Sequence, residues 1–168
     1  MTVVWVFGGA AVLLLGLVIW AGHKMVTAPG AGSGGASDAL GNFITKIGSD
    51  LAKMREADRP DKVIVVVLTD GQENMSQAWT RSRVKDLVKL QEDVYKWNFV
   101  FLGSNMDAVA EGASIGFSED SSLTYNDDSP VAVAAAFGAT SNYISMARSG
   151  NLAGASFSAA ERGAANQE

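Results

Sequence analysis

One apolar stretch constrains the fold of this chain more than any other feature. Residues Val63 to Leu68 are six consecutive apolar residues, and they run directly into Thr69-Asp70-Gly71. A short β-branched run without alternation is typical of a parallel strand covered on both faces. In α/β proteins, ligands bind just beyond the carboxyl ends of such strands. Asp70 is therefore a candidate site residue, although Asp-Gly after a strand is also a common turn sequence.

The composition limits the classes of function. A chain of 168 residues with 48% hydrophobic residues supports one domain with appendages. Its net charge is -5, with 13 Lys and Arg residues and no basic cluster, which argues against nucleic acid as a partner. There is no cysteine, so disulfides and thiolate chemistry are excluded, and the single histidine leaves little room for histidine-based catalysis.

The first residues are apolar enough to cross a membrane. Met1 to Gly22 contains no charged residue, and Trp5 and Trp20 lie near its two ends. A helix of about 20 apolar residues spans the hydrocarbon core, and indole rings prefer the interface. The sequence therefore predicts a single-pass transmembrane anchor over residues 1–24, with residues 2–22 in the membrane. Lys24 after the helix favours a body on the cytoplasmic side.

Two other interpretations of this segment stay open. A cleaved signal peptide fits less well, because the segment has no basic start and its apolar run is long. Alternatively, Thr2 to Phe7 forms a soluble strand and Ala10 to Trp20 a buried helix, joined at Gly8-Gly9. A Gly/Ala/Ser linker over residues 25–36 follows in either case.

The body of the chain alternates between helical and strand patterns. Helices are predicted from Ser37, from Thr80, after Asp107 and from Ser129, and strands at residues 63–68, 98–103 and 122–125. This alternation predicts an α/β fold, a Rossmann-like parallel sheet with helices on both faces, over residues 37–149. Residues 150–168 are rich in Ala, Gly and Ser, and are expected to form a flexible tail or a weak terminal helix.

Two segments carry a resemblance to a known family. KVIVVVLTDGQEN, followed by WNFVFLGSNMDAVAEGASIGF, resembles the second half of bacterial and phage von Willebrand factor type A (VWA) domains. The resemblance covers residues 37–149. It implies a truncated VWA-type sheet that carries a metal-ion-dependent adhesion site at its carboxyl edge. Such sites hold Mg²⁺ or Mn²⁺ through oxygen ligands.

The resemblance also indicates which residues would form the site. Asp70 falls at the third metal loop, and Ser33 and Ser37 are weaker candidate ligands near the second. Further residues of the ligand edge would be Gly71, Asn74, Ser104 and Asn105. The first metal loop of the family, Asp-x-Ser-x-Ser, occurs nowhere in this chain. The predicted metal site is therefore incomplete.

The missing first half of the domain has a structural consequence. In the family, the strand corresponding to Val63–Leu68 lies beside the opening strand of the sheet. Without that neighbour the strand would present an apolar edge, which invites pairing with another chain. We therefore predict that a protein partner or a second copy completes the sheet at Val63–Leu68. Residues 2–7 folding back as the missing strand, or cover by the linker and helices, are the alternatives.

The function predicted from the sequence is a membrane-anchored, non-catalytic VWA-like module that binds a protein. A structural subunit of a membrane or phage assembly is the first alternative. A small hydrolase that uses Asp70 and Glu73 is the second, but no nucleophile and base accompany these carboxylates.

Overall fold

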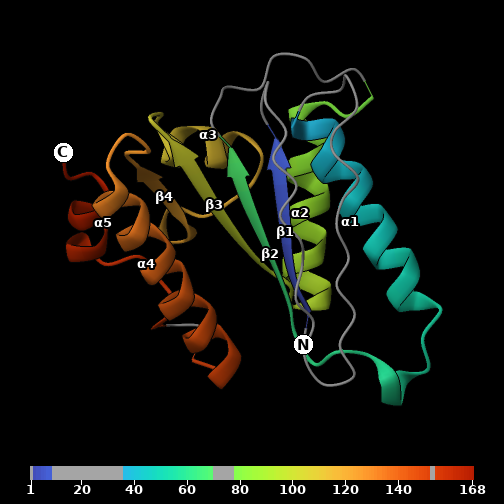
Figure 1. Cartoon of the computed structure of the whole chain (residues 1–168). Helices are drawn as coiled ribbons and strands as arrows, with labels where there is room; N and C mark the ends of the chain where they lie inside the picture. The colour runs from blue at the N-terminus through green and yellow to red at the C-terminus, as the bar shows by residue number, and fades with distance from the viewer. Residues whose placement is uncertain (1, 9–35, 70–77, 152–153) are drawn as a thin grey trace.

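The computed structural model describes residues 2–8, 36–69, 78–151 and 154–168, which form an α/β structure (Figure 1). Within these residues the sheet has four strands in the order β1-β2-β3-β4, and every neighbouring pair is parallel. The strands are β1 (Thr2–Gly8), β2 (Val63–Thr69), β3 (Asn98–Ser104) and β4 (Ser122–Tyr125). The predicted parallel sheet with helices on both faces is confirmed.

The first strand differs from the main prediction for the amino terminus. Thr2–Gly8 pairs with β2 from Thr2 opposite Val63 to Gly8 opposite Thr69. Residues 2–8 therefore form a strand where the main prediction has a membrane helix, and the alternative of a strand over Thr2 to Phe7 describes them, with one residue more. A run rich in valine and aromatic residues is as compatible with a strand as with a membrane helix, and pairing with β2 selects the strand. In the described part of the chain, no helix is long and apolar enough to cross a membrane. Residues 9–24 and the linker up to residue 35 lie outside the described residues.

The predicted open edge at Val63–Leu68 is also corrected. Strand β2 lies between β1 and β3, so both of its sides are hydrogen-bonded. A partner chain has no place to pair with β2 in this arrangement. Strand β1 takes the position beside β2, and it contains residues 2–7, the segment predicted as one alternative for the missing strand.

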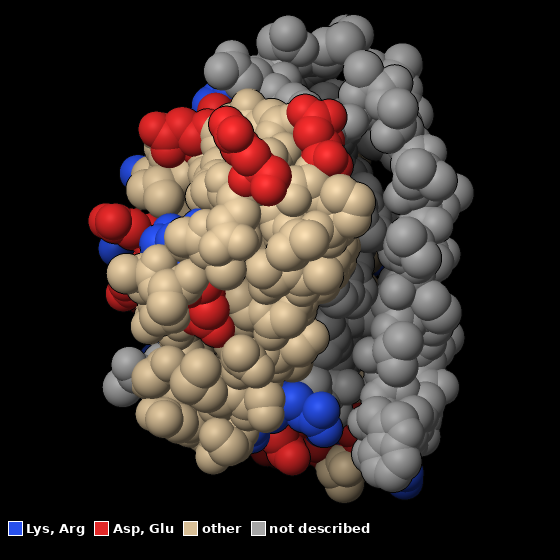
Figure 2. Space-filling model, turned by 60° about the vertical axis from the view of Figure 1, so that its left-hand side comes forward, with Lys and Arg blue, Asp and Glu red and all other residues tan. Residues whose placement is uncertain are grey.

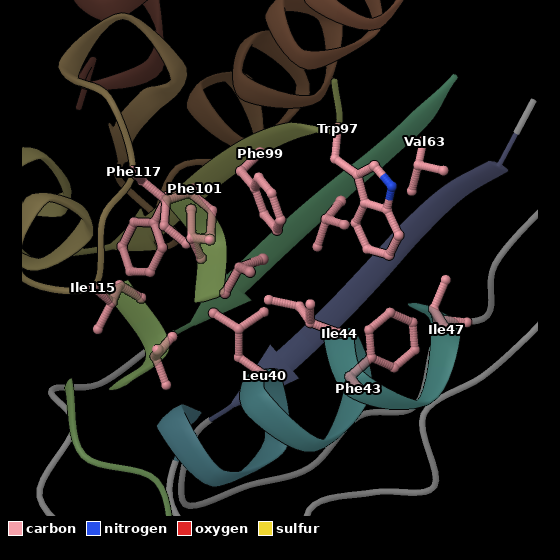
Figure 3. Close-up of a cluster of buried hydrophobic side chains, with 14 of the residues drawn as sticks. Leu40, Phe43, Ile44, Ile47, Val63, Trp97, Phe99, Phe101, Ile115 and Phe117 are labelled. Atoms are coloured by element: carbon pink, nitrogen blue, oxygen red, sulfur yellow. The ribbon is translucent and has the colours of Figure 1, made fainter. Parts of the chain in front are cut away.

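One face of the sheet is covered by α1 (Ala36–Ala52), α2 (Arg81–Tyr95) and α3 (Ala108–Ser114) (Figure 1). The inward face of α1 presents Leu40, Phe43, Ile44 and Ile47 to the side chains of β2 and β3 (Figure 3). Their spacing places them on one face of a helix, as the sequence predicts. The helix begins at Ala36, one residue before the predicted start, so Ser37 lies in its first turn.

The opposite face is covered by α4 (Pro130–Ser149) and α5 (Ala159–Ala165). Two short 3-10 helices, η1 (Glu56–Asp58) and η2 (Glu119–Ser121), precede β2 and β4. Helix α4 starts as predicted, with Ser129 accepting a hydrogen bond from the Ala132 amide and Pro130 at the first helical position.

The described part of the carboxyl-terminal segment is not a flexible tail. Phe157 and Ala165 are buried against β4 and α4, and Arg162 donates 2.7 Å hydrogen bonds to the carbonyl oxygens of Ser122 and Glu119. Ser158 and Glu161 form a reciprocal capping box at the start of α5. Of the two expectations for this segment, the terminal helix is the one found. Small Ala and Gly residues allow this short helix to approach the sheet closely, while a few large side chains supply the buried area.

Candidate functional site

The carboxyl edge of the sheet is the candidate site, because three strands deliver their last residues there. Strands β1, β2 and β3 end at Gly8, Thr69 and Ser104, and Thr69 is paired with Gly8 on one side and Gly103 on the other. Helix α1 begins at the same edge (Figure 1). Four of the predicted site residues, Ser33, Asp70, Gly71 and Asn74, lie outside the described residues. Asp70 follows Thr69 directly in the chain.

Asp38 connects the amino end of α1 to the residues that precede α2. Its Oδ1 accepts hydrogen bonds from the amides of Ala78 and Trp79, at 2.9 and 2.6 Å. Hydrogen bonds to a charged acceptor are stronger than neutral ones, and a carboxylate is also favoured in the first turn of a helix. The chain on either side of residues 70–77 is thus fixed, by β2 at one end and by Asp38 at the other. This role of Asp38 was not predicted from the sequence.

The Trp79 side chain packs against α1 at Gly41. The Trp79 indole Nε1 donates a 2.9 Å hydrogen bond to Asn42 Oδ1, and the Arg83 guanidinium lies 4.9 Å from the ring centre. A Cβ atom at Gly41 would lie 2.2 Å from Trp79 Cδ2, so only glycine permits this contact.

We expect Gly41→Ala and Gly48→Ala to change stability in opposite directions. Alanine in a helix is normally more stable than glycine by about 0.5–1 kcal/mol. That gain is expected at Gly48, where nothing lies within 4 Å of the added Cβ. At Gly41 the clash with Trp79 should instead lower the free energy of unfolding by about 1–2 kcal/mol. Urea unfolding followed by circular dichroism measures both, and a stabilising Gly41→Ala would contradict the contact.

Ser37, Ser104 and Asn105 lie at this edge. Ser37 is buried in the first turn of α1, and Ser104 is buried opposite Tyr125 at the end of β3. Asn105 has a left-handed backbone, with φ 50°, which asparagine adopts more readily than most residues. Its amide donates to the Tyr125 carbonyl at 2.9 Å, and its side chain donates to Asp127.

Several carboxylates give the edge an acidic character. Asp107, Asp127 and Asp128 are exposed and form no ion pair within the described residues. Asp107 also caps α3 by accepting from the Ala110 amide at 2.9 Å. By contrast, Glu111 is paired with Arg81 at 2.8 Å. Figure 2 shows acidic side chains gathered toward the upper end of the face that it presents. Asp127 and Asp128 were not singled out from the sequence, although an acidic pair just after a strand could have indicated them.

The described residues do not contain a cluster of three or more acidic, histidine or cysteine side chains placed to hold a metal ion. The metal site implied by the resemblance depends on Asp70, which lies outside these residues. Mg²⁺ or Mn²⁺ binding therefore stays a prediction.

Glu92, in the last turn of α2, is a titratable group away from this edge whose pKa is raised. Burial raises the pKa of Glu92 from 4.5 to about 7, with a further increase from Asp93 and an opposing decrease from Lys89. A pKa that is higher in the folded state means that the folded chain binds more protons than the unfolded chain between these two values. Stability from this group is therefore present below about pH 4.5 and is lost as the pH rises through about 7.

We expect Glu92→Gln to flatten the pH dependence of stability in this window. The glutamine side chain does not ionise, so no charge develops at this half-buried position as the pH rises. The variant should therefore lose less stability than the wild type between about pH 5 and about pH 7.5. Urea unfolding at the two pH values measures the difference. Glu56→Gln, at an exposed position, is the control, and equal slopes for Glu92→Gln and the wild type would exclude Glu92 as the source.

Comparison of this chain with protein-family models, with curated proteins and with solved structures found no match.

Proposed function

We propose that this chain is a non-catalytic, VWA-like protein-binding module that uses the carboxyl edge of its sheet. The observation that carries the proposal is the meeting of three strand ends with the amino end of α1, which Asp38 ties to the chain before α2. Parallel α/β sheets bind ligands at this edge, and loops held by a rigid scaffold are common binding elements.

The charges of this edge indicate the kind of partner. No cation in the described part of the chain pairs with the carboxylates of Asp107, Asp127 and Asp128. A partner with basic side chains would neutralise these negative charges. Complementary charge raises the association rate and selects among partners. We therefore propose a protein partner whose contact surface is basic.

Reversing charges at two places tests this proposal. The full chain with Asp127→Lys and Asp128→Lys should lose its partner in affinity capture from the cells that produce it. The matched control, Glu56→Lys and Asp58→Lys, reverses two exposed charges in η1, near the start of β2. It should retain the partner. Identical capture by both variants, or no capture by the wild-type chain, would overturn the proposal.

A divalent ion would contribute weakly to this binding. We propose Asp70 as its main ligand, with Ser33 and Ser37 as minor candidates, and we expect a dissociation constant no tighter than about millimolar, because too few ligands compensate for dehydration of the ion. Calorimetric titration with Mg²⁺ and Mn²⁺, beside Asp70→Ala, tests this assignment. Equal heats from the two proteins would remove the ion from the proposal.

Attachment to a membrane through the apolar amino-terminal segment stays a prediction. With residues 2–8 in the sheet, the attached segment would be limited to the uncharged residues 9–22. Carbonate extraction of membranes tests it, and release of the intact chain into the soluble fraction would exclude the anchor.

A further inference from the structure

A hollow lies at the amino-terminal edge of the sheet, opposite the candidate site. It has a volume of about 580 Å³, within the range of sites that bind small molecules. Its walls come from the second half of α1, the last turns of α2 and the starts of β2 and β3. The apolar part of the lining consists of Ile44, Leu51, Val63, Leu87, Leu90 and Trp97.

Gln91 is a polar residue in this apolar wall without a side-chain partner. The residue is only 8% exposed, and its side-chain amide forms no hydrogen bond with another residue in the part of the chain that the structure describes. Its backbone carbonyl is occupied by the Trp97 amide at 3.1 Å. The polar atoms of its side chain are not fully buried, so they stay accessible to water or to a ligand in the hollow.

The Trp97 side chain adds a second polar group to the same wall. Trp97 is 6% exposed, and its indole Nε1 has no hydrogen-bond partner among the described residues. Figure 3 shows its ring beside Val63 and above Ile44, with the nitrogen drawn in blue. An indole N–H is a donor only, whereas the Gln91 amide both donates and accepts.

The cations at the rim already have partners. Lys62 Nζ donates to the carbonyl oxygens of Ala147 and Arg148, at 2.7 and 3.0 Å. The Arg59 guanidinium donates to carbonyl oxygens at the end of α1, including that of Leu51 at 3.1 Å. The other polar residues of the lining, Thr45, Ser49, Asp61 and Tyr95, are exposed. Recognition in the inner part of this hollow therefore falls to the neutral groups of Gln91 and Trp97.

We propose that this hollow binds a small amphipathic molecule with an apolar, ring-sized body and a neutral carboxamide head. The apolar lining would take the body. The carbonyl oxygen of the head would accept from the Trp97 Nε1–H, and its amide nitrogen would donate to the Gln91 side-chain oxygen. A carboxylate could accept the hydrogen bond from Trp97 but could not donate one to Gln91. A hydrocarbon could form neither hydrogen bond.

A matched set of probes tests the assignment on the full chain. We would titrate 3-phenylpropanamide, 3-phenylpropanoate and ethylbenzene, and measure binding by saturation-transfer NMR. The amide should bind most tightly, ahead of the other two by about three- to tenfold, which corresponds to one hydrogen bond. Tighter binding of the carboxylate, or equal binding of all three, would overturn the neutral head.

Two substitutions locate the binding and separate it from folding. Gln91→Leu keeps the size of the side chain and removes its amide, so the preference for the amide probe should be lost while the midpoint of thermal unfolding stays close to that of the wild type. Trp97→Phe should also weaken amide binding. Val131→Ala, at an exposed position on α4, is the control and should bind as the wild type does. Unchanged amide binding in both Gln91→Leu and Trp97→Phe would overturn the proposal.

Discussion

Phe99→Ala is expected to lower the free energy of unfolding by about 3–5 kcal/mol, as large-to-small changes of buried aromatic residues do. Phe99 is 1% exposed in the middle of the sheet, in the cluster shown in Figure 3. Its ring centre lies 5.5 Å from that of Phe117, edge to face, and 6.3 Å from that of Trp97. Alanine would leave a cavity and remove both ring contacts.

The control for this change is another phenylalanine of the same chain. Phe137 on α4 is 40% exposed, so Phe137→Ala removes less buried surface and should cost less than about 1 kcal/mol. Urea unfolding followed by circular dichroism gives both values. Similar losses for the two variants would mean that Phe99 does not occupy the core position described.

The double substitution Val4→Pro and Trp5→Pro is expected to cost about 3 kcal/mol or more. These residues are paired with Val65 and Val66 of β2. Alternate residues of a parallel strand bond to the same neighbour, so one of the two prolines must remove a hydrogen bond to β2. Proline also restricts the backbone of the strand and leaves a carbonyl of β2 without its partner.

The control keeps the amide donors at both positions. Val4→Thr with Trp5→Tyr retains residues that favour strands, and should stay close to the wild type in urea unfolding. The comparison also separates the two interpretations of the amino terminus, because proline is tolerated in membrane helices. Equal unfolding midpoints for the proline pair and the control pair would show that residues 2–8 are not a strand of this sheet.

Most of the fold could be predicted from local patterns. The run from Val63 to Leu68 predicts β2, the run from Asn98 predicts β3, and the helical spacing from Leu40 to Ile47 predicts the buried face of α1. Thr80, Asp107 and Ser129 each cap the helix predicted after them. Periodicity and capping residues act within a few positions, so they can be recognised without knowledge of the rest of the chain.

The candidate site could be predicted only in part. Parallel strands deliver Thr69 and Ser104 to one edge, and this follows from the topology that the alternation predicts. The contact between Asp38 and Trp79 could not be predicted, because it joins residues 41 positions apart. The pairing of Asn105 with Asp127 is another contact between residues far apart in the chain.

The sequence by itself determined most helices and strands between residues 37 and 149 and that the sheet is parallel. It left the identity of residues 2–8 open, because apolar β-branched residues suit a membrane helix and a buried strand equally. Tertiary structure decided this question through the register with β2, which satisfies backbone hydrogen bonds along one side of each strand. The same holds for α5, whose short helix is fixed by the Arg162 contacts with the residues before and at the start of β4. Where local sequence does not determine the secondary structure of a segment, the segment adopts the conformation in which neighbouring elements satisfy its backbone hydrogen bonds.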